Sequence, residues 1–356
     1  MNTQPFHINI DQAVLDDLQR RIHQTRWPDA PSLSNLKDLV AYWADGFDWR
    51  KTETAVNAYP QFITEIDGYK IHYLHIKSAA AGAMPVIISH GWPGSFIEML
   101  KVIPLLDDFH LVIPSLLGFG FSDKRGGSTS LMAELWVKLM IQLGYERFIA
   151  QGGDFGATIS TRMAMKYPQN LAGLHLNYIP FNYRPYFPSG AEPGAAQEKF
   201  FKAEGAYSQV QATKPGVLSC GLNDSPVGLC AWILEIFKSF SDPSASLDQL
   251  FDRDQLLSHI TLYWVTQCVY SSMLLYSEKE GLDFGPEDFI EVPVGVAKYP
   301  FPDSFPKRAF VERGYNVVYW KEKEVGGHFA GMEVPEVFAG DFRAFVQEIL
   351  LHLQHF

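Results

Sequence analysis

The chain of 356 residues contains little cysteine and few basic residues. Its three cysteines, Cys220, Cys230 and Cys268, are odd in number and spaced like neither a disulfide framework nor a zinc site. Lys and Arg total 29 against 40 Asp and Glu, which gives a formal net charge of -11. No basic run offers a surface for phosphate groups, so the sequence argues against nucleic acid as a partner.

Long hydrophobic runs are also missing. Apolar runs such as Pro85–Ser89 fall far short of the roughly 20 residues of a membrane span, and the start, MNTQPFHINIDQ, has no charged region followed by an apolar stretch. We therefore expect no membrane anchor and, with so few cysteines, a cytoplasmic location. What the chain does contain is 47% hydrophobic and 14% aromatic residues, enough for a large folded core.

The order of predicted strands and helices indicates the fold class. From residue 62 onward, short β-branched runs such as PVIISH alternate with helical stretches, which predicts β-α-β units on a mostly parallel sheet with helices on both faces. The alternation stops at Pro180 and resumes near VPVGVAK. We therefore predict a lead-in segment at 1–60, an α/β core at 61–180 and 285–356, and a helical insertion at 181–284.

The pentapeptide GGDFG at 152–156 follows the strand-like run RFIAQ and precedes a helix. A strand, a sharp turn and a helix form a nucleophile elbow, and its apex here is Asp154. A carboxylate is already ionised at neutral pH, so it can attack a carbon electrophile without a base and form an ester. An Asp that caps the following helix explains the pentapeptide equally well. A dinucleotide-binding loop fits less well, because its first glycine is replaced by Gln151.

The hexapeptide HGWPGS at 90–95 also joins a predicted strand to a helix. In a hydrolase sheet this loop supplies one oxyanion donor and the residue after the nucleophile supplies the other. The candidates are the backbone N–H groups of Trp92 and Phe155. A tight turn that needs Gly and Pro only for its geometry is the alternative.

A third loop, GGHF at 326–329, follows the strand-like run YNVVYW. Its histidine, His328, lies downstream of the elbow, where a general base is expected. The acid that orients it should follow the preceding strand, and Asp303 occupies that place, although a Pro-Asp turn residue explains it as well. Glu291 is less well placed, because it precedes the strand.

The helical insertion is rich in tyrosine, including Tyr207, Tyr263, Tyr270 and Tyr276. Aromatic residues at helical spacing usually pack a core, but a tyrosine hydroxyl can also stabilise an alkoxide as a strained ring opens. Spacing alone does not select any of the four.

Together these segments resemble the α/β-hydrolase-fold epoxide hydrolases of the microsomal type over essentially the whole chain. The similar segments are LDDLQRRIHQTRWPD, HGWPGS, GGDFG, YSQVQATKP, LNDSPVGLCAWILEIF and GGHFAGMEVPE. The resemblance implies an α/β-hydrolase core with an inserted helical cap and an N-terminal wrapping segment. It also implies a small epoxide as substrate, a role in detoxification, and no metal or organic cofactor.

The resemblance further implies roles for single residues. Asp154 is similar to the nucleophile, His328 to the base that activates water, and Tyr207 and Tyr276 to the two cap tyrosines that bind the epoxide oxygen. The reaction would pass through a hydroxyalkyl ester on Asp154 and yield a vicinal diol. The acid departs from the family pattern: Asp303 comes one residue later, so either the loop is shifted or His328 is oriented differently.

Two other functions fit parts of the sequence. A haloalkane or haloacid dehalogenase on the same fold shares the Asp and His, but it often has Trp directly after the nucleophile, where this chain has Phe155. A non-catalytic ligand-binding homologue would explain the displaced acid but not the retained motifs. A serine esterase is disfavoured by Asp at the elbow. The sequence does not identify the particular epoxide. It is compatible with a monomer or with a homo-oligomer.

Overall fold

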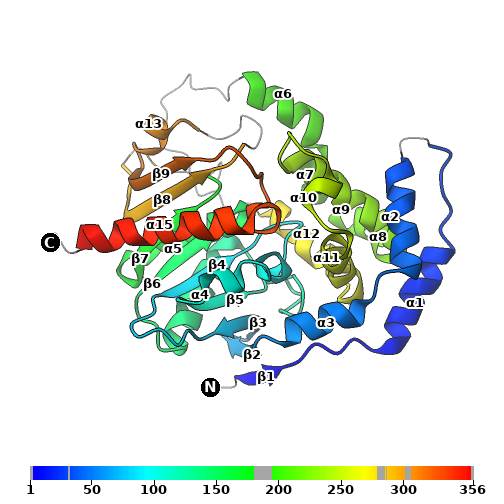
Figure 1. Ribbon diagram of the computed structural model, residues 1–356, viewed down its shortest axis with the longest axis horizontal. Helices are drawn as coiled ribbons and strands as arrows, with labels where there is room; N and C mark the ends of the chain where they lie inside the picture. The colour runs from blue at the N-terminus through cyan, green and yellow to red at the C-terminus, as the bar shows by residue number, and fades with distance from the viewer. Residues whose placement is uncertain are drawn as a thin grey trace.

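The computed structural model describes residues 3–30, 33–179, 195–278, 285, 287–300 and 306–353. Within these residues a single nine-stranded sheet runs through the molecule in the order β1-β2-β3-β5-β4-β6-β7-β8-β9 (Figure 1). The strands are β1 (Gln4–Phe6), β2 (Gln61–Ile66), β3 (Tyr69–Ile76), β4 (Pro85–Ser89), β5 (His110–Pro114), β6 (Phe148–Gly152), β7 (Leu171–Leu176), β8 (Ile290–Lys298) and β9 (Tyr315–Glu322).

The sheet is antiparallel at one edge and parallel elsewhere. β1, β2, β3 and β5 pair antiparallel, whereas β5, β4, β6, β7, β8 and β9 pair parallel. The β2–β3 hairpin turns at Asp67 and Gly68, whose φ angles of 51° and 78° are those a two-residue hairpin turn requires. The edge strand β1 is a feature that the sequence analysis did not predict.

Both faces of the parallel region are buried, because alternate residues of each strand point to opposite sides. In β4, Ile87 belongs to the core under α4 (Thr129–Gln142) and α5 (Asp154–Lys166), whereas Val86 and Ile88 belong to the core under α15 (Pro335–Leu353). Figure 1 shows α15 crossing one face of the sheet. This double burial explains the continuous apolar run in PVIIS.

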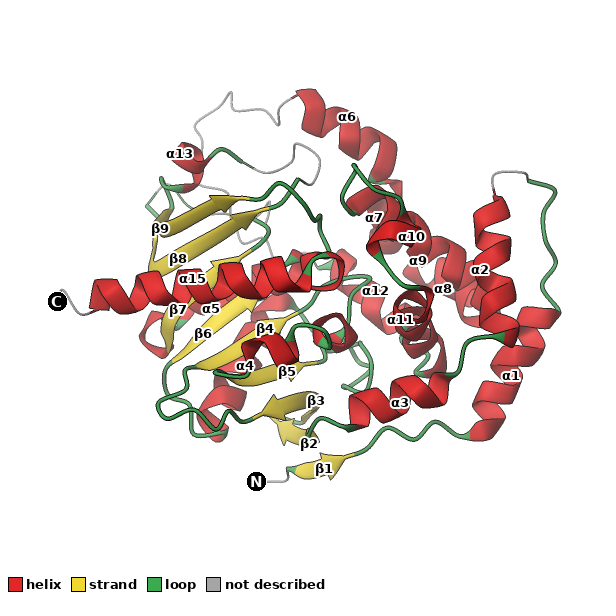
Figure 2. Cartoon of the chain, in the orientation of Figure 1, coloured by secondary structure: helices red, strands yellow, loops and turns green. Residues whose placement is uncertain are grey.

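A group of helices lies between β7 and β8 in the sequence and forms a second layer beside the carboxyl ends of the strands (Figure 2). They are α6 (Ala195–Glu204), α7 (Ala206–Thr213), α8 (Pro215–Asp224), α9 (Pro226–Phe240), α10 (Leu247–Leu250), α11 (Arg253–Val265), α12 (Val269–Met273) and η6 (Leu274–Ser277). We call these helices the cap. Helix α9 begins with Ser225 accepting a hydrogen bond from the N–H of Gly228, and Pro226 occupies its first turn.

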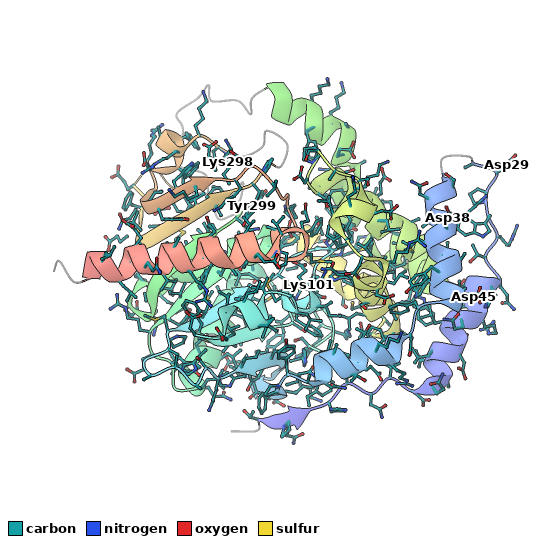
Figure 3. All side chains as sticks on the ribbon, in the orientation of Figure 1. Asp29, Asp38, Asp45, Lys101, Lys298 and Tyr299 are labelled. Atoms are coloured by element: carbon teal, nitrogen blue, oxygen red, sulfur yellow. The ribbon has the colours of Figure 1, made fainter. Side chains whose placement is uncertain are left out.

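The first helices of the chain pack against the cap. They are α1 (Gln12–His23), α2 (Ser34–Asp45) and α3 (Trp49–Asn57). The Trp43 indole N–H donates to Thr261 Oγ1 at 3.0 Å, and the hydroxyls of Thr52 and Ser258 lie 2.6 Å apart. Charged residues of both signs are exposed on this segment, among them Asp29, Asp38 and Asp45 (Figure 3) as well as Arg26 and Lys37.

Short helical turns complete the described structure: η2 (Phe96–Met99), η3 (Ile103–Leu106), η4 (Pro168–Asn170), α13 (Arg308–Val311) and α14 (Ala330–Glu333). The helix predicted to follow HGWPGS is formed by η2, which a turn connects to η3. In the part of the chain that the structure describes, no single helix has the length and apolarity of a membrane span, and only α8 and α9, bent by 119°, meet those criteria as a pair.

Replacement of Trp43 tests how much the N-terminal helices contribute to stability. Its side chain is fully buried, so Trp43→Ala should lower the free energy of unfolding in urea by about 3–5 kcal/mol through lost burial and an unfilled cavity. Val217→Ala, at a position that is 76% exposed, should change it by less than about 0.5 kcal/mol. Equal small effects of both changes would show that the segment is only loosely attached.

Candidate active site

Asp154 stands at a strained turn between β6 and α5. Its φ of 51° lies in the left-handed region that side chains other than glycine rarely adopt. The N-cap of α5 is Gly153, and no side chain caps the helix, so helix capping does not explain this Asp. The backbone instead directs the carboxylate away from α5 and toward the HGWPGS loop, as in a nucleophile elbow.

Two glycines allow this turn to pack closely. A β-carbon at Gly156 would overlap the carbonyl oxygen of Ser89, so glycine is needed where α5 approaches the end of β4. A β-carbon at Gly91 would overlap the carboxylate of Asp154 itself. Gly91 therefore makes room for the carboxyl group, and Gly156 allows the elbow to pack against β4.

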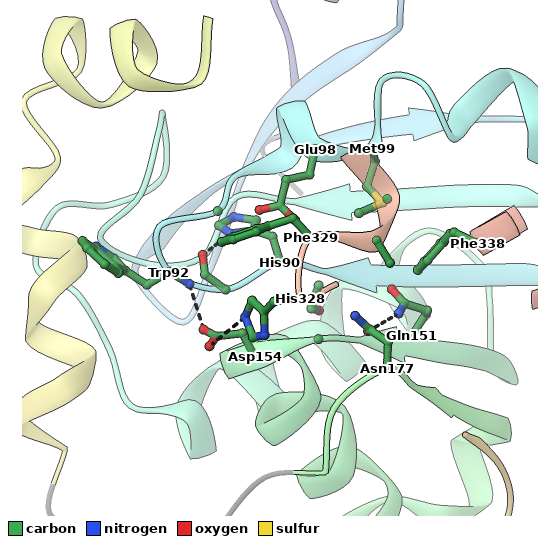
Figure 4. A pocket seen from close by; sticks show the side chains of 16 residues that line it. His90, Trp92, Glu98, Met99, Gln151, Asp154, Asn177, His328, Phe329 and Phe338 are labelled. Carbon is green, nitrogen blue, oxygen red and sulfur yellow. Dashed lines mark hydrogen bonds and ion pairs between the residues drawn. The ribbon is translucent and has the colours of Figure 1, made fainter. Parts of the chain in front are cut away.

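The two oxygens of Asp154 have different partners (Figure 4). Oδ1 accepts a hydrogen bond from the backbone N–H of Trp92 at 2.9 Å, whereas Oδ2 lies 3.4 Å from His328 Nε2. The Asp154 side chain is 23% exposed and the His328 side chain 10%. Phe155 follows in the first turn of α5, partly buried, and its ring meets that of Tyr276 edge-on at 5.0 Å. The structure thus brings Asp154, Trp92, Phe155 and His328 together.

Cap helix α11 holds the HGWPGS loop. Tyr263 OH donates to the carbonyl of Gly94 at 2.7 Å, and His259 Nε2 bonds the carbonyl of Pro93. His259 Nδ1 lies 3.3 Å from Ser95 Oγ. These contacts fix the backbone that presents the Trp92 N–H, and they give Tyr263 a structural task. The sequence carried no signal that would have singled out His259.

Two of the predicted tyrosines line the space above Asp154. The ring of Tyr207 stacks on Trp92 at 5.7 Å, Tyr276 meets Trp92 edge-on at 5.7 Å, and the two tyrosine rings are 5.9 Å apart. Desolvation raises the pKa of both hydroxyls, and the charge of Asp154 raises it further. Both are therefore neutral donors at physiological pH. Tyr270, the remaining candidate of the four, is 49% exposed.

His328 is fixed by its backbone and by aromatic rings. Its N–H donates to the carbonyl of Phe240 at 2.9 Å, at the end of α9. The rings of Phe240 and Tyr178 approach the imidazole edge-on at 5.8 and 6.0 Å. The predicted orienting acid, Asp303, lies outside the described residues.

A small cavity of about 30 Å³ lies beside Asp154 and His328, on the core side of the carboxylate (Figure 4). This volume suits one water molecule. Its polar lining includes Ser89, His90, Glu98, Gln151, Asp154, Asn177 and His328. Gln151 Nε2 donates to Asn177 Oδ1 at 3.1 Å, which links the ends of β6 and β7 below the elbow.

Glu98 is a buried carboxyl group that sequence reasoning missed. Burial raises its pKa to about 8, the hydrogen bond from the Ser95 N–H opposes this shift, and the charge of Asp154 adds to it. Glu98 is therefore mostly a neutral acid near pH 7. Its position three residues after Ser95 is a capping box, which is a signal for a helix start but not for a site.

Comparison with known proteins agrees with this geometry. Residues 3–99 match the family model described as epoxide hydrolase N terminus, and residues 84–211 match the alpha/beta hydrolase fold. The chain belongs to the α/β-hydrolase-fold epoxide hydrolases. Epoxide hydrolase 1 of Sus scrofa is 34% identical over 96% of this chain and 88% of that protein.

Solved structures of this family have the same fold. The juvenile hormone epoxide hydrolase of Bombyx mori is 30% identical and superimposes with a TM-score of 0.87, covering 98% of this chain and 95% of that one. The Aspergillus niger epoxide hydrolase is 27% identical with a TM-score of 0.83, over 98% and 97% of the two chains. The predicted α/β-hydrolase fold with an inserted cap is confirmed.

The raised pKa of Glu98 predicts a specific dependence of stability on pH. Between its ordinary pKa of 4.5 and the folded value of about 8, the folded chain keeps a proton that the unfolded chain releases, so stability falls as pH rises. Glu98→Gln should remove this fall, which is at most about 1.4 kcal/mol per pH unit. Urea unfolding of both proteins across this range measures the difference.

Buried histidines change the stability with pH in the opposite direction. Burial lowers the pKa of His72 to about 3 and of His90 and His259 to about 4, so they cost stability as pH falls below 6.5. Glu98→Gln leaves these histidines in place, so the difference between the two proteins isolates Glu98. Glu65→Gln, at an exposed position, should leave the profile unchanged. Parallel profiles for Glu98→Gln and the parent would contradict the neutral state of Glu98.

Proposed function

We propose that this epoxide hydrolase opens an epoxide to a vicinal diol in two steps, through an ester on Asp154 that water activated by His328 hydrolyses. The observation that carries the proposal is the unequal environment of the Asp154 carboxylate. Oδ1 is held by the Trp92 N–H at 2.9 Å, whereas Oδ2 faces His328 at 3.4 Å. One oxygen is oriented and the other is left for attack.

In the first step the free carboxylate oxygen attacks a ring carbon of the epoxide, forming a C–O bond as the ring C–O bond breaks. The departing oxygen becomes an alkoxide, which Tyr207 and Tyr276 stabilise by donating hydrogen bonds and a proton. Burial keeps both hydroxyls neutral, and the pKa of each is raised by the charge of Asp154. Ring strain and preorganised donors together lower the barrier, and the product is a hydroxyalkyl ester of Asp154.

In the second step water attacks the carbonyl carbon of the ester. His328 accepts the proton of this water, and the N–H groups of Trp92 and Phe155 stabilise the oxyanion that forms. The cavity of about 30 Å³ touches both Asp154 and His328, which is where the attacking water must lie. Collapse of the intermediate regenerates the carboxylate, and the departing diol oxygen keeps the remaining proton of the attacking water. The proton held by His328 then returns through solvent to the tyrosine that protonated the alkoxide, which restores the starting state. In this proposal Asp303 orients His328.

We also propose that the enzyme removes reactive epoxides in the cytoplasm. All three cysteines are unpaired, which agrees with a reducing compartment. Fractionation of the native cells tests the location, and recovery of the protein with membranes or outside the cell would contradict it.

The order of the two steps predicts opposite effects of two substitutions. His328→Gln should trap the ester, because formation of the ester needs no base, whereas Asp154→Asn should form none. Intact mass after incubation with a small aryl epoxide, followed by peptide mapping to Asp154, measures the adduct. Equal adduct in both variants would overturn the assigned roles. A haloalkane of similar size is tested in parallel. If it gives an alkyl adduct and the epoxide gives none, the protein is a dehalogenase instead.

The two cap tyrosines predict a selective effect on the first step. Tyr207→Phe and Tyr276→Phe should each slow formation of the ester by about 100-fold, because one donor to the developing alkoxide is lost. Rapid-quench measurement of the ester in the His328→Gln background isolates this step. Tyr270→Phe, on the exposed side of α12, is the matched control and should leave the rate unchanged. A full rate in both active-site variants would show that another group binds the oxygen.

A further inference from the structure

Two buried carboxylates tie the His328 loop to the end of cap helix α9. Glu333 Oε1 accepts the N–H of Phe329 at 2.9 Å, and its Oε2 accepts the N–H of Asp242 at 2.8 Å. Asp242 Oδ2 in turn accepts the N–H of Gly326 at 2.8 Å. Asp242 is 5% exposed and Glu333 9%. Each carboxylate thus bridges two segments that lie far apart in the sequence.

The loop between β9 and α14 is also held by the buried ring of Phe329, which stacks on Phe237 of α9 at 4.1 Å. Gly326 has a φ of 91°, and neither it nor Gly327 carries a side chain that packs. Gly327 instead lies directly against the backbone of Ser241 and Asp242, where a β-carbon would not fit. The position of His328 therefore depends on hydrogen bonds between the loop and the end of α9, together with the ring contacts of Phe240 and Phe237.

The same end of α9 also contacts the tyrosine side of the site. The ring of Phe240 lies edge-on to Tyr207 at 5.7 Å and to His328 at 5.8 Å, and the carbonyl of Phe240 accepts the His328 N–H at 2.9 Å. A shift of this helix end relative to the loop would alter the distance between the base and the cap tyrosine.

We infer that Asp242 and Glu333 are positioning residues that fix His328 to the end of cap helix α9 and are needed for hydrolysis of the ester rather than for its formation. The inference rests on the proposed two-step reaction. Only the second step needs His328 within hydrogen-bond reach of water, so a loosened loop slows that step and spares the first.

The chemistry of Glu333 provides a precise substitution. Its two oxygens each accept a backbone N–H, which a carboxylate can do and a primary amide cannot, because the amide NH₂ would face one of the donors. Burial raises the pKa of Glu333 to about 7, while the hydrogen bonds from Asp242 and Phe329 and the charge of His328 oppose this shift. At about pH 8.5 the group is mainly a carboxylate, so Glu333→Gln removes one bridge.

The test is the steady-state and pre-steady-state kinetics of Glu333→Gln at about pH 8.5, with an aryl epoxide. We expect kcat to fall by about 10- to 100-fold and KM to fall in parallel, leaving kcat/KM within about threefold. The reason is that kcat/KM contains only the steps up to the first irreversible one, which in this proposal is the opening of the strained ring. The ester should accumulate in quenched samples. Glu336→Gln, an exposed carboxylate at the start of α15, is the matched control and should behave like the parent.

A second variant guards against a merely structural effect. Asp242→Ala removes the acceptor for the Gly326 N–H and should show the same parallel fall of kcat and KM. A lower kcat at constant KM without accumulated ester, in either folded variant, would overturn the inference, as would kinetics like those of the parent. If His328→Gln also accumulates no ester in this assay, the two-step proposal fails instead.

Discussion

The hydrogen bond from the Trp92 N–H to the Asp154 carboxylate is the contact on which the site depends, because it joins two loops that the sequence separates by about sixty residues. It requires a left-handed backbone conformation at Asp154. It also requires glycine at position 91, where a side chain would collide with the carboxylate, and at position 156, where one would collide with the end of β4. Backbone strain of this kind is held only when the surroundings over-determine it. Here the parallel strands β4 and β6, with α5 packed against them, supply that rigidity.

Rigidity of the oxyanion loop comes from the cap and from the N-terminal segment. Tyr263 and His259 of α11 bond the carbonyls of the HGWPGS loop. Helix α11 is itself bonded to the N-terminal helices through Thr261 and Ser258. A continuous series of contacts therefore runs from the first sixty residues to the Trp92 N–H. This gives the N-terminal segment a physical reason to accompany the catalytic core: it supports the helix that supports the loop.

The site also separates two kinds of carboxyl group by their surroundings. Asp154 is partly exposed and receives a backbone N–H, which suits an ionised nucleophile. Glu98, a few residues after the oxyanion loop, is buried and has a pKa near 8, so it adds little negative charge next to Asp154. Glu333 lies between these cases, with its burial opposed by two backbone donors. Asp154, Glu98 and Glu333 therefore lie in one small region without adding three full negative charges near pH 7, because burial raises the pKa of the two glutamates.

Local signals in the sequence determined the order of strands and helices apart from the edge strand β1, and they determined the elbow, the oxyanion loop and the histidine loop. Each of these depends on neighbouring residues whose glycines, prolines and apolar periodicity are visible in the chain. The same signals also determined the family. Spacing does not distinguish Tyr207 and Tyr276 from Tyr263 and Tyr270, and only the resemblance to the family selected them. Tertiary structure supplies the physical difference, since Tyr207 and Tyr276 pack together whereas Tyr263 bonds Gly94 and Tyr270 is exposed. It likewise revealed Asp242, His259 and Glu333, whose partners lie far away in the sequence. Long-range hydrogen bonds leave no periodicity in a chain, so only the folded molecule shows them.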